Sequence, residues 1–266
     1  MLPATEFLAS NDPKFSERVG RPDLGTFVAA NPPPFSIGAA TPPPPASDDW
    51  PYIYHRGHSI PRAYLTISLI LLAMAFLMTR GTISVRKTST WNFFFLGAGF
   101  LLLETQMVSR LALYFGATWL VNCVALSAIL ITLVLANFWV EWRKPKQLLI
   151  FYAALVACLG VIYLIPWAAL PFGSRVVGTL LAAAYGFPVF FAGIIFAETF
   201  RRSEDKSGSF GSNIVGAVAG GLAQNVSFVI GLKALLLLAI VFYVLASVFG
   251  RDMNKSALLR PTAANQ

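Results

Sequence analysis

Charged residues are scarce in this chain: Asp, Glu, Lys and Arg make up 12% of its 266 residues, about half of their share in ordinary soluble domains. Hydrophobic residues make up 56%. This balance excludes a soluble globular domain as the main unit and predicts a protein that contacts the lipid bilayer. Most Lys and Arg residues lie between apolar runs, so the net charge of +8 indicates topology signals and lipid headgroup contacts, with no nucleic acid partner.

Residues that hold metals or carry catalysis are also few. Cys123 and Cys158, the two cysteines, lie inside apolar runs without partners at metal-ligand spacing, which disfavours a zinc site or a disulfide framework. His55 and His58 could share a helical face, but a metal site needs more ligands than surround them. The chain has no phosphate loop, no GxSxG elbow and no HExxH motif. We therefore expect no metal, no cofactor and no catalytic residue.

Proline is concentrated near the start of the chain. Residues 1–50 contain Pro32 to Pro34 and Pro42 to Pro45, with small residues between them. Such a segment favours extended conformations and cannot bury a core, so we expect a disordered tail or linker; a docking segment or the remnant of an upstream domain is the alternative. No basic segment precedes an apolar run, so we expect no cleavable secretory signal. Aromatic and basic residues over 51–62 predict an interfacial segment.

Seven apolar runs of roughly bilayer-spanning length follow. They cover residues 63–79, 91–113, 118–140, 148–170, 176–200, 210–230 and 232–249. Because about 20 helical residues cross the hydrocarbon core, the sequence predicts an all-α, polytopic membrane protein with about seven transmembrane helices over residues 63–250 and a short polar tail over 251–266. Pro166, Pro171 and Pro188 predict that the fourth and fifth helices are kinked or end early. The sixth run predicts a span, with a re-entrant segment as the alternative.

Lys and Arg are distributed unevenly between the two sides of these runs. Twelve lie in the loops of one side and in the C-terminal tail, against four on the other side. Since positive residues are retained in the cytoplasm, the count predicts a cytoplasmic C-terminus and an external N-terminus. At the end of the fifth run, Glu198 precedes Arg201 and Arg202 by three and four residues, which predicts an ion pair on one helix face.

The second run carries Glu104, Gln106 and Arg110 in its second half, where ionisable groups are costly. Gln106 and Arg110 are four residues apart and share a helical face, whereas Glu104 points elsewhere. These residues could line a substrate or ion path, with Arg110 compensating Glu104 or binding an anionic group. Alternatively, Arg110 reaches the membrane interface near Tyr114, and Glu104 is protonated or joins two helices.

The sixth run, GSNIVGAVAGGLAQNVSF, combines small residues with amides. Gly216 and Gly220 have the GxxxG spacing that lets two helix backbones approach closely. Asn213, Gln224 and Asn225 are the further candidates for lining a polar substrate or ion path. Close helix packing alone also explains this pattern.

Four stretches together resemble the C-terminal membrane region of bacterial spermidine synthase-like membrane proteins. They are DDWPYIYHRGHSIPRAYL, FFFLGAGFLLLETQMVSRLALYFGATWLVN, FFAGIIFAETFRR and NIVGAVAGGLAQNVSFVIGLKALLLLA, and the resemblance covers roughly residues 46–250. In that family a methyltransferase-like catalytic domain precedes the membrane region, but that domain and its catalytic residues have no counterpart here. The family often carries Glu near the position of Gln224 and Lys near that of Gln106, where this chain has neutral amides.

The resemblance implies a protein of the bacterial inner membrane that is not catalytic alone and serves as anchor, partner or conduit for a separately encoded catalytic subunit. A preceding catalytic domain in the cytoplasm conflicts with the external N-terminus that the charge count predicts. The alternatives are a transporter of a small solute, such as a polyamine or an ion, and an inactive truncated gene product.

Overall fold

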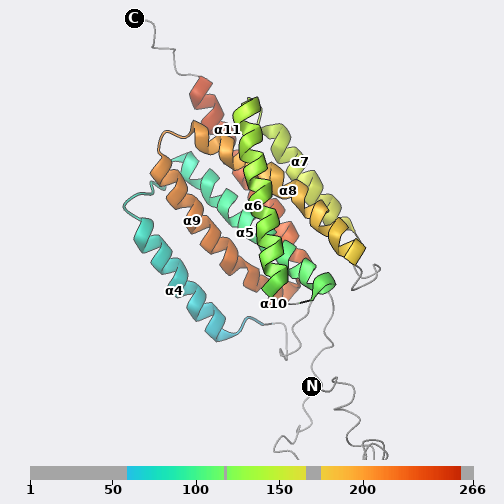
Figure 1. The fold of residues 1–266 in the computed structure, drawn as a ribbon. Coiled ribbons are helices and arrows are strands. Elements are labelled where there is room, and N and C mark those ends of the chain that lie inside the picture. The colour runs from blue at the N-terminus through green and yellow to red at the C-terminus, as the bar shows by residue number, and fades with distance from the viewer. Residues whose placement is uncertain (1–58, 117–118, 166–174, 259–266) are drawn as a thin grey trace, which may run out of the picture. The chain divides into compact units, whose positions relative to one another are not determined.

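The computed structural model describes residues 59–116, 119–165 and 175–258 (Figure 1). Every element in these ranges is helical: α4 (Arg62–Thr79), α5 (Thr88–Phe115), α6 (Trp119–Arg143), α7 (Leu149–Leu164), α8 (Arg175–Arg202), α9 (Lys206–Ala223), the 3-10 turn η3 (Gln224–Val226), α10 (Ser227–Ile230) and α11 (Lys233–Leu258). The all-α fold class is therefore confirmed. The tail predicted over residues 1–50 and most of the interfacial segment lie outside the described residues.

Five of the seven apolar runs become helical segments whose bounds lie within four residues of the predicted ones, and the exceptions are α7 and α11. Helix α7 ends at Leu164, just before Pro166, as the proline predicts, whereas α8 continues through Pro188. In the sixth run, α9, η3 and α10 form one continuous helical segment that ends at Gly231, whose φ of 88° is a conformation that glycine adopts freely. This segment is long and apolar enough to cross a bilayer, as the predicted span requires. Helix α11 extends to Leu258, beyond the predicted start of the polar tail.

Five helical segments in the described part of the chain are long and apolar enough to cross a membrane: α4, α6, α8, α11 and the segment from Lys206 to Ile230. The prediction of about seven spans exceeds this number by two. Helix α7 has only 16 residues, because the chain leaves the helix before Pro166. Helix α5 has 28 residues, but Glu104, Gln106 and Arg110 lower its hydropathy.

Helix α5 lies at the centre of the bundle, where it contacts α6, α8, α9 and α11 (Figure 1). Its residues Phe93, Leu102 and Leu103 are fully buried and belong to the main hydrophobic core. Helices α5 and α9 run parallel, since Phe94 lies beside Gly216 and Ala98 beside Gly220. The apolar run that carries Glu104, Gln106 and Arg110 therefore forms the central helix of the bundle.

Helices α4 and α6 leave many of their hydrophobic side chains exposed. Ser68 is the one buried residue of α4, all of whose 18 residues are described. On α6, Trp119 and Trp142 are 76% and 69% exposed and are about 34 Å apart at 1.5 Å per residue. Exposed tryptophans at such a separation match the two interfaces of a bilayer, whose hydrocarbon core is about 30 Å thick. The described bundle is thus built to contact lipid.

Candidate functional site

The seam between α5 and α9 is a close approach of two backbones. A Cβ atom added at Gly216 would overlap the carbonyl oxygen of Phe94, and one added at Gly220 would overlap that of Ala98. On the α5 side, a Cβ atom at Gly97 would overlap the carbonyl oxygen of Asn213. Small residues therefore allow these helices to approach until the backbones touch, which gives dispersion contacts along the whole seam.

Gln106 and Arg110 lie inside the bundle, toward the end where α5 finishes. The Gln106 side chain is fully buried and its Nε2 donates a hydrogen bond to the carbonyl oxygen of Leu232, between α10 and α11. The Arg110 side chain is 2% exposed, so it does not reach the surface as the interfacial alternative expected. The fully buried Tyr185 of α8 belongs to the same region, and its hydroxyl group makes no hydrogen bond with the described residues.

Glu104 lies apart from this cluster, as its helical position predicts. Its side chain is half-buried and forms no hydrogen bond or ion pair within the part of the chain that the structure describes. The neighbouring Thr105 donates a 2.8 Å hydrogen bond to the carbonyl oxygen of Leu101, one turn earlier in α5. Compensation of Glu104 by Arg110 is therefore not part of this arrangement.

Asn213 lines a small cavity at the centre of the bundle. The cavity has a volume of about 230 Å³ and is bordered by residues of α5, α6, α8, α9 and α11. Asn213 donates a long, 3.3 Å hydrogen bond to the carbonyl oxygen of Phe93. Tyr243 of α11 is fully buried at the cavity wall, and its hydroxyl group has no hydrogen-bond partner among the described residues. The cavity walls are therefore largely apolar, and Asn213 contributes their polar side chain.

Gln224 and Asn225 lie at the junction of α9 and η3. Asn225 donates a 3.0 Å hydrogen bond from its side chain to the hydroxyl of Ser68 on α4. The backbone carbonyl of Gln224 accepts a 2.6 Å hydrogen bond from the Ser227 hydroxyl. Of the six residues predicted to line a polar path, Gln106, Asn213 and Asn225 donate hydrogen bonds to groups on other segments, and their joint role in one path stays a prediction.

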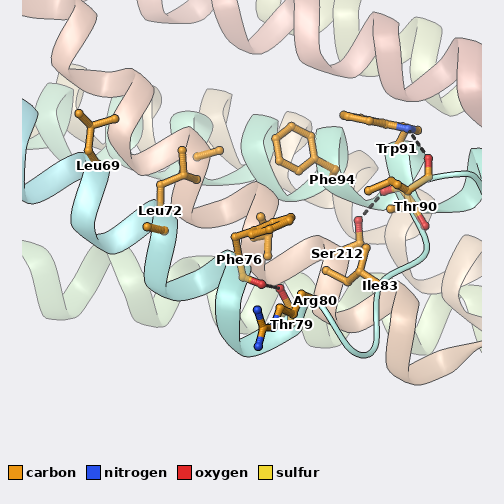
Figure 2. Close-up of a pocket in the computed structure, with 14 residues that line it drawn as sticks. Leu69, Leu72, Phe76, Thr79, Arg80, Ile83, Thr90, Trp91, Phe94 and Ser212 are labelled. Carbon is orange, nitrogen blue, oxygen red and sulfur yellow. Dashed lines mark hydrogen bonds between the residues drawn. The ribbon is translucent and has the colours of Figure 1, made fainter.

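A larger cavity lies between α4, the first turns of α5 and α9, and sequence reasoning did not predict it. Its volume is about 670 Å³, within the range of small-molecule sites. Figure 2 shows Leu69, Leu72 and Phe76 of α4 facing Phe94 and Trp91 of α5 across it. Helix α4 is apolar on nearly every side, so its sequence has no hydrophobic stripe that would reveal which side faces the cavity.

The walls of this cavity are apolar, because its hydroxyl groups are already engaged. Thr79 donates to the carbonyl oxygen of Ala75 at 2.7 Å, and Thr90 donates to that of Ser84 at 2.7 Å. Ser212 donates to the carbonyl oxygen of Thr90 (Figure 2). The other polar side chains of the lining are Trp91, whose indole nitrogen donates to the carbonyl oxygen of Val85 at 3.0 Å, and the exposed Arg80 at the end of α4.

A network of charged and polar contacts joins three loops at the end of the bundle where α5 and α9 begin. The fully buried Glu198 carboxylate accepts hydrogen bonds from Arg201 at 2.8 and 2.6 Å and from Arg202 at 2.6 Å. Arg202 also donates to the carbonyl oxygen of Pro145, between α6 and α7, at 2.6 Å. The predicted ion pair on the face of α8 is therefore present, and it additionally holds a neighbouring loop.

Asp205 connects the same network to the start of α9. Its carboxylate accepts a 2.8 Å hydrogen bond from the backbone amide of Gly208 and caps the helix. It also forms a 2.9 Å ion pair with Lys87, which precedes α5. The backbone hydrogen bond, followed by the Lys87 contact, lowers the pKa of Asp205 below its ordinary value.

Comparison with known proteins adds no relative: no family model matches the chain, and no curated protein or solved structure is significantly similar to it. Within the described residues, no group of three or more His, Cys, Asp or Glu side chains could hold a metal ion. The described helices form a polytopic helical membrane protein, whose cavities include the small one lined by Asn213 and the larger one beside α4.

Proposed function

We propose that this chain is an anchor or partner in the bacterial inner membrane for a separately encoded, spermidine synthase-like catalytic subunit, and that it is not catalytic alone. One observation carries the proposal: several buried polar side chains of the bundle are engaged in structural contacts with neighbouring protein groups. Gln106 donates a hydrogen bond to the carbonyl oxygen of Leu232, and Asn225 donates one to the hydroxyl of Ser68. Glu198 forms ion pairs with Arg201 and Arg202 of its own helix. A membrane scaffold needs such contacts, whereas a catalytic site would need polar groups that converge on one place.

The proposed docking surface is the basic end of the bundle, defined by the loops before α5, α7 and α9 and by the last turns of the described α11. Its cations are Arg80, Arg86, Lys87, Arg143, Lys144, Lys146, Arg201, Arg202, Lys206 and Arg251, whereas Arg62, Arg175 and Lys233 lie at the opposite end. This asymmetry supports a cytoplasmic position of the basic end. A separate catalytic subunit docked there would be cytoplasmic while the N-terminus stays outside, which removes the conflict noted above.

Vesicle flotation tests this proposal. The synthase-like subunit from the same genome is mixed with vesicles that contain the full chain, and it should float with them in a salt-sensitive manner. Replacing Arg86, Arg143 and Arg251 together by Gln should release the subunit, whereas Arg62→Gln at the opposite end should not. Flotation that is equal in all three preparations, or absent from the wild-type vesicles, would refute docking at the basic end.

A second function, transport of a small solute such as a polyamine, is favoured by the central cavity. Asn213 supplies a polar side chain there, the ring of Tyr243 borders the cavity, and Glu104 supplies a half-buried carboxylate on α5. Vesicles that contain the protein should then accumulate labelled spermidine, and Glu104→Gln should reduce the rate. Absence of uptake by the wild-type protein would leave the anchor as the better proposal.

A further inference from the structure

Helix α4 is held to the bundle at two places and separated from it between them. Near its start, the ring of Tyr64 packs on Phe228 with centroids 5.4 Å apart, and the Ser68 hydroxyl accepts the hydrogen bond of Asn225. Beyond its end, Ile83 lies beside Gly211 of α9. The lateral cavity of about 670 Å³ occupies the interval between these two contacts. Helix α4 therefore covers this cavity on one side, and the cavity is called the slot below.

The chemistry of the slot fits a hydrocarbon chain better than a polar solute. The hydroxyls of Thr79, Thr90 and Ser212 are bonded to backbone carbonyls, and the indole nitrogen of Trp91 donates to the carbonyl oxygen of Val85 at 3.0 Å. A polar ligand would lose its hydration without gaining partners along these walls. An apolar chain would lose no hydrogen bond and would gain contacts with Leu, Phe and Ala side chains.

One end of the slot is cationic. Arg80 belongs to its lining and is exposed, and Arg86 is exposed six residues further along the same loop. Lys87, which follows Arg86, is engaged with Asp205. An ammonium headgroup would be repelled by these arginines, whereas a phosphate without a compensating cation would be attracted, and Arg can bind phosphate through two parallel hydrogen bonds.

We propose that the slot beneath α4 is a binding site for one anionic phospholipid of the bilayer, whose acyl chain lies between α4, α5 and α9 and whose phosphate contacts Arg80. The lipid fills the interval that α4 leaves open and belongs to the leaflet at the basic end. Anionic lipids concentrate in the cytoplasmic leaflet, which is the leaflet that the positive-inside asymmetry assigns to this end. The site does not depend on a catalytic partner.

Trp91 gives a direct readout, because it lines the slot. The full-length protein is reconstituted in phosphatidylcholine vesicles with a small fraction of either phosphatidylglycerol or phosphatidylcholine brominated in the acyl chain, since bromine quenches indole fluorescence on contact. The Trp91 signal is the difference between the wild-type protein and Trp91→Phe. We expect brominated phosphatidylglycerol to quench it with about fivefold higher apparent affinity, the factor that one cation near an anionic surface contributes. Unlabelled phosphatidylglycerol should reverse this quenching.

Two variants separate the headgroup contact from the chain contact. Arg80→Gln should bring the apparent affinities of the two lipids to nearly the same value, while Arg62→Gln, at the other end of α4, should leave the preference intact. Ala219→Phe, which places a large side chain in the slot, should abolish quenching by both lipids, and an unchanged elution profile in size-exclusion chromatography verifies its fold. Equal quenching by both lipids in the wild-type protein, or a preference that survives Arg80→Gln, would overturn the proposal. Absence of any quenching would mean that another segment or a second copy fills the slot, which also overturns it.

Discussion

The side-chain amide of Asn225 donates a 3.0 Å hydrogen bond to the hydroxyl of Ser68, the buried residue of an otherwise exposed α4. Polar groups that face each other between lipid-exposed helices have no water to replace a lost partner, so this bond orients α4 on the junction of α9 and η3. The ring contact between Tyr64 and Phe228 lies one turn away and supports the same junction.

Removal of this bond should loosen α4 without unfolding the bundle. We expect Ser68→Ala and Asn225→Ala each to lower the free energy of unfolding in detergent by about 0.5–1 kcal/mol. The double variant should cost less than the sum of the two, because both remove the same bond. Ser127→Ala, at an exposed position of α6, serves as the control. Additive effects in a double-mutant cycle would show that the two side chains do not interact.

The seam between α5 and α9 should tolerate no added side-chain atom. Gly216→Ala would place a methyl group on the backbone of Phe94, so we expect a loss of about 1–3 kcal/mol in the free energy of unfolding. Gly160→Ala in α7 is the matched control, because a Cβ atom there meets no atom within 4 Å. It should be neutral or slightly stabilising, since Ala is the better helix former. Thermal unfolding in detergent compares the two; an equal change in Tm would contradict the close approach.

Loss of the buried carboxylate of Glu198 should free the loop between α6 and α7. In Glu198→Gln the charge that orients both arginines is removed, and Arg202 loses the partner that directs it toward Pro145. We expect faster hydrogen exchange over residues 144–148 and a cost of about 1–3 kcal/mol, at the lower end because the arginines are partly exposed. Arg202→Lys, which keeps the charge but not the geometry, should reproduce the loop effect alone. A loop whose exchange stays slow in both variants would argue against this connection.

The start of α9 should loosen in acid. The pKa of Asp205 is depressed in the folded protein, first by the Gly208 amide and then by Lys87. The stabilisation from its carboxylate is therefore complete above the ordinary Asp pKa of about 3.9 and is lost as the pH falls through the lower, folded value. Hydrogen exchange at Gly208, corrected for its intrinsic rate, should rise below about pH 4 in the wild-type protein. Asp205→Asn keeps a capping oxygen without a charge and should flatten this dependence; an unchanged pH profile in Asp205→Asn would assign the effect to another group.

The sequence predicts the helices well because their boundaries depend on local chemistry. Apolar runs define the helix lengths, and Pro166 places the end of α7 where the backbone can no longer donate a hydrogen bond. The spacing of Glu198 and the arginines after it is also local, so their ion pair is predictable. The predicted number of spans, about seven, differs by two from the five segments that are long and apolar enough, because α7 is short and α5 carries Glu104, Gln106 and Arg110.

The sites are harder to predict because they depend on which helices become neighbours. Gln106 donates a hydrogen bond to the carbonyl of Leu232, which lies more than a hundred residues later in the sequence. Asn225 donates one to Ser68, which lies more than a hundred residues earlier. Helical spacing assigns these side chains to faces, but it does not say what each face meets. The lateral cavity is the extreme case: it exists because α4 stands away from α5, and no residue pattern within α4 encodes that separation.

The parallel pairing of α5 with α9 has a consequence for biosynthesis. Gly216 packs against the backbone of Phe94, but α6, α7 and α8 are synthesised between α5 and α9. Helix α5 is therefore synthesised well before the helix that it packs against. At roughly 5–20 residues per second, the intervening chain takes on the order of 6–24 s to appear. Throughout that interval Gln106 lacks the carbonyl oxygen of Leu232, although polar groups are costly in lipid. We therefore expect α5 to remain beside the insertion machinery until α9 and Leu232 emerge, and site-specific crosslinking of nascent chains of increasing length would time its release.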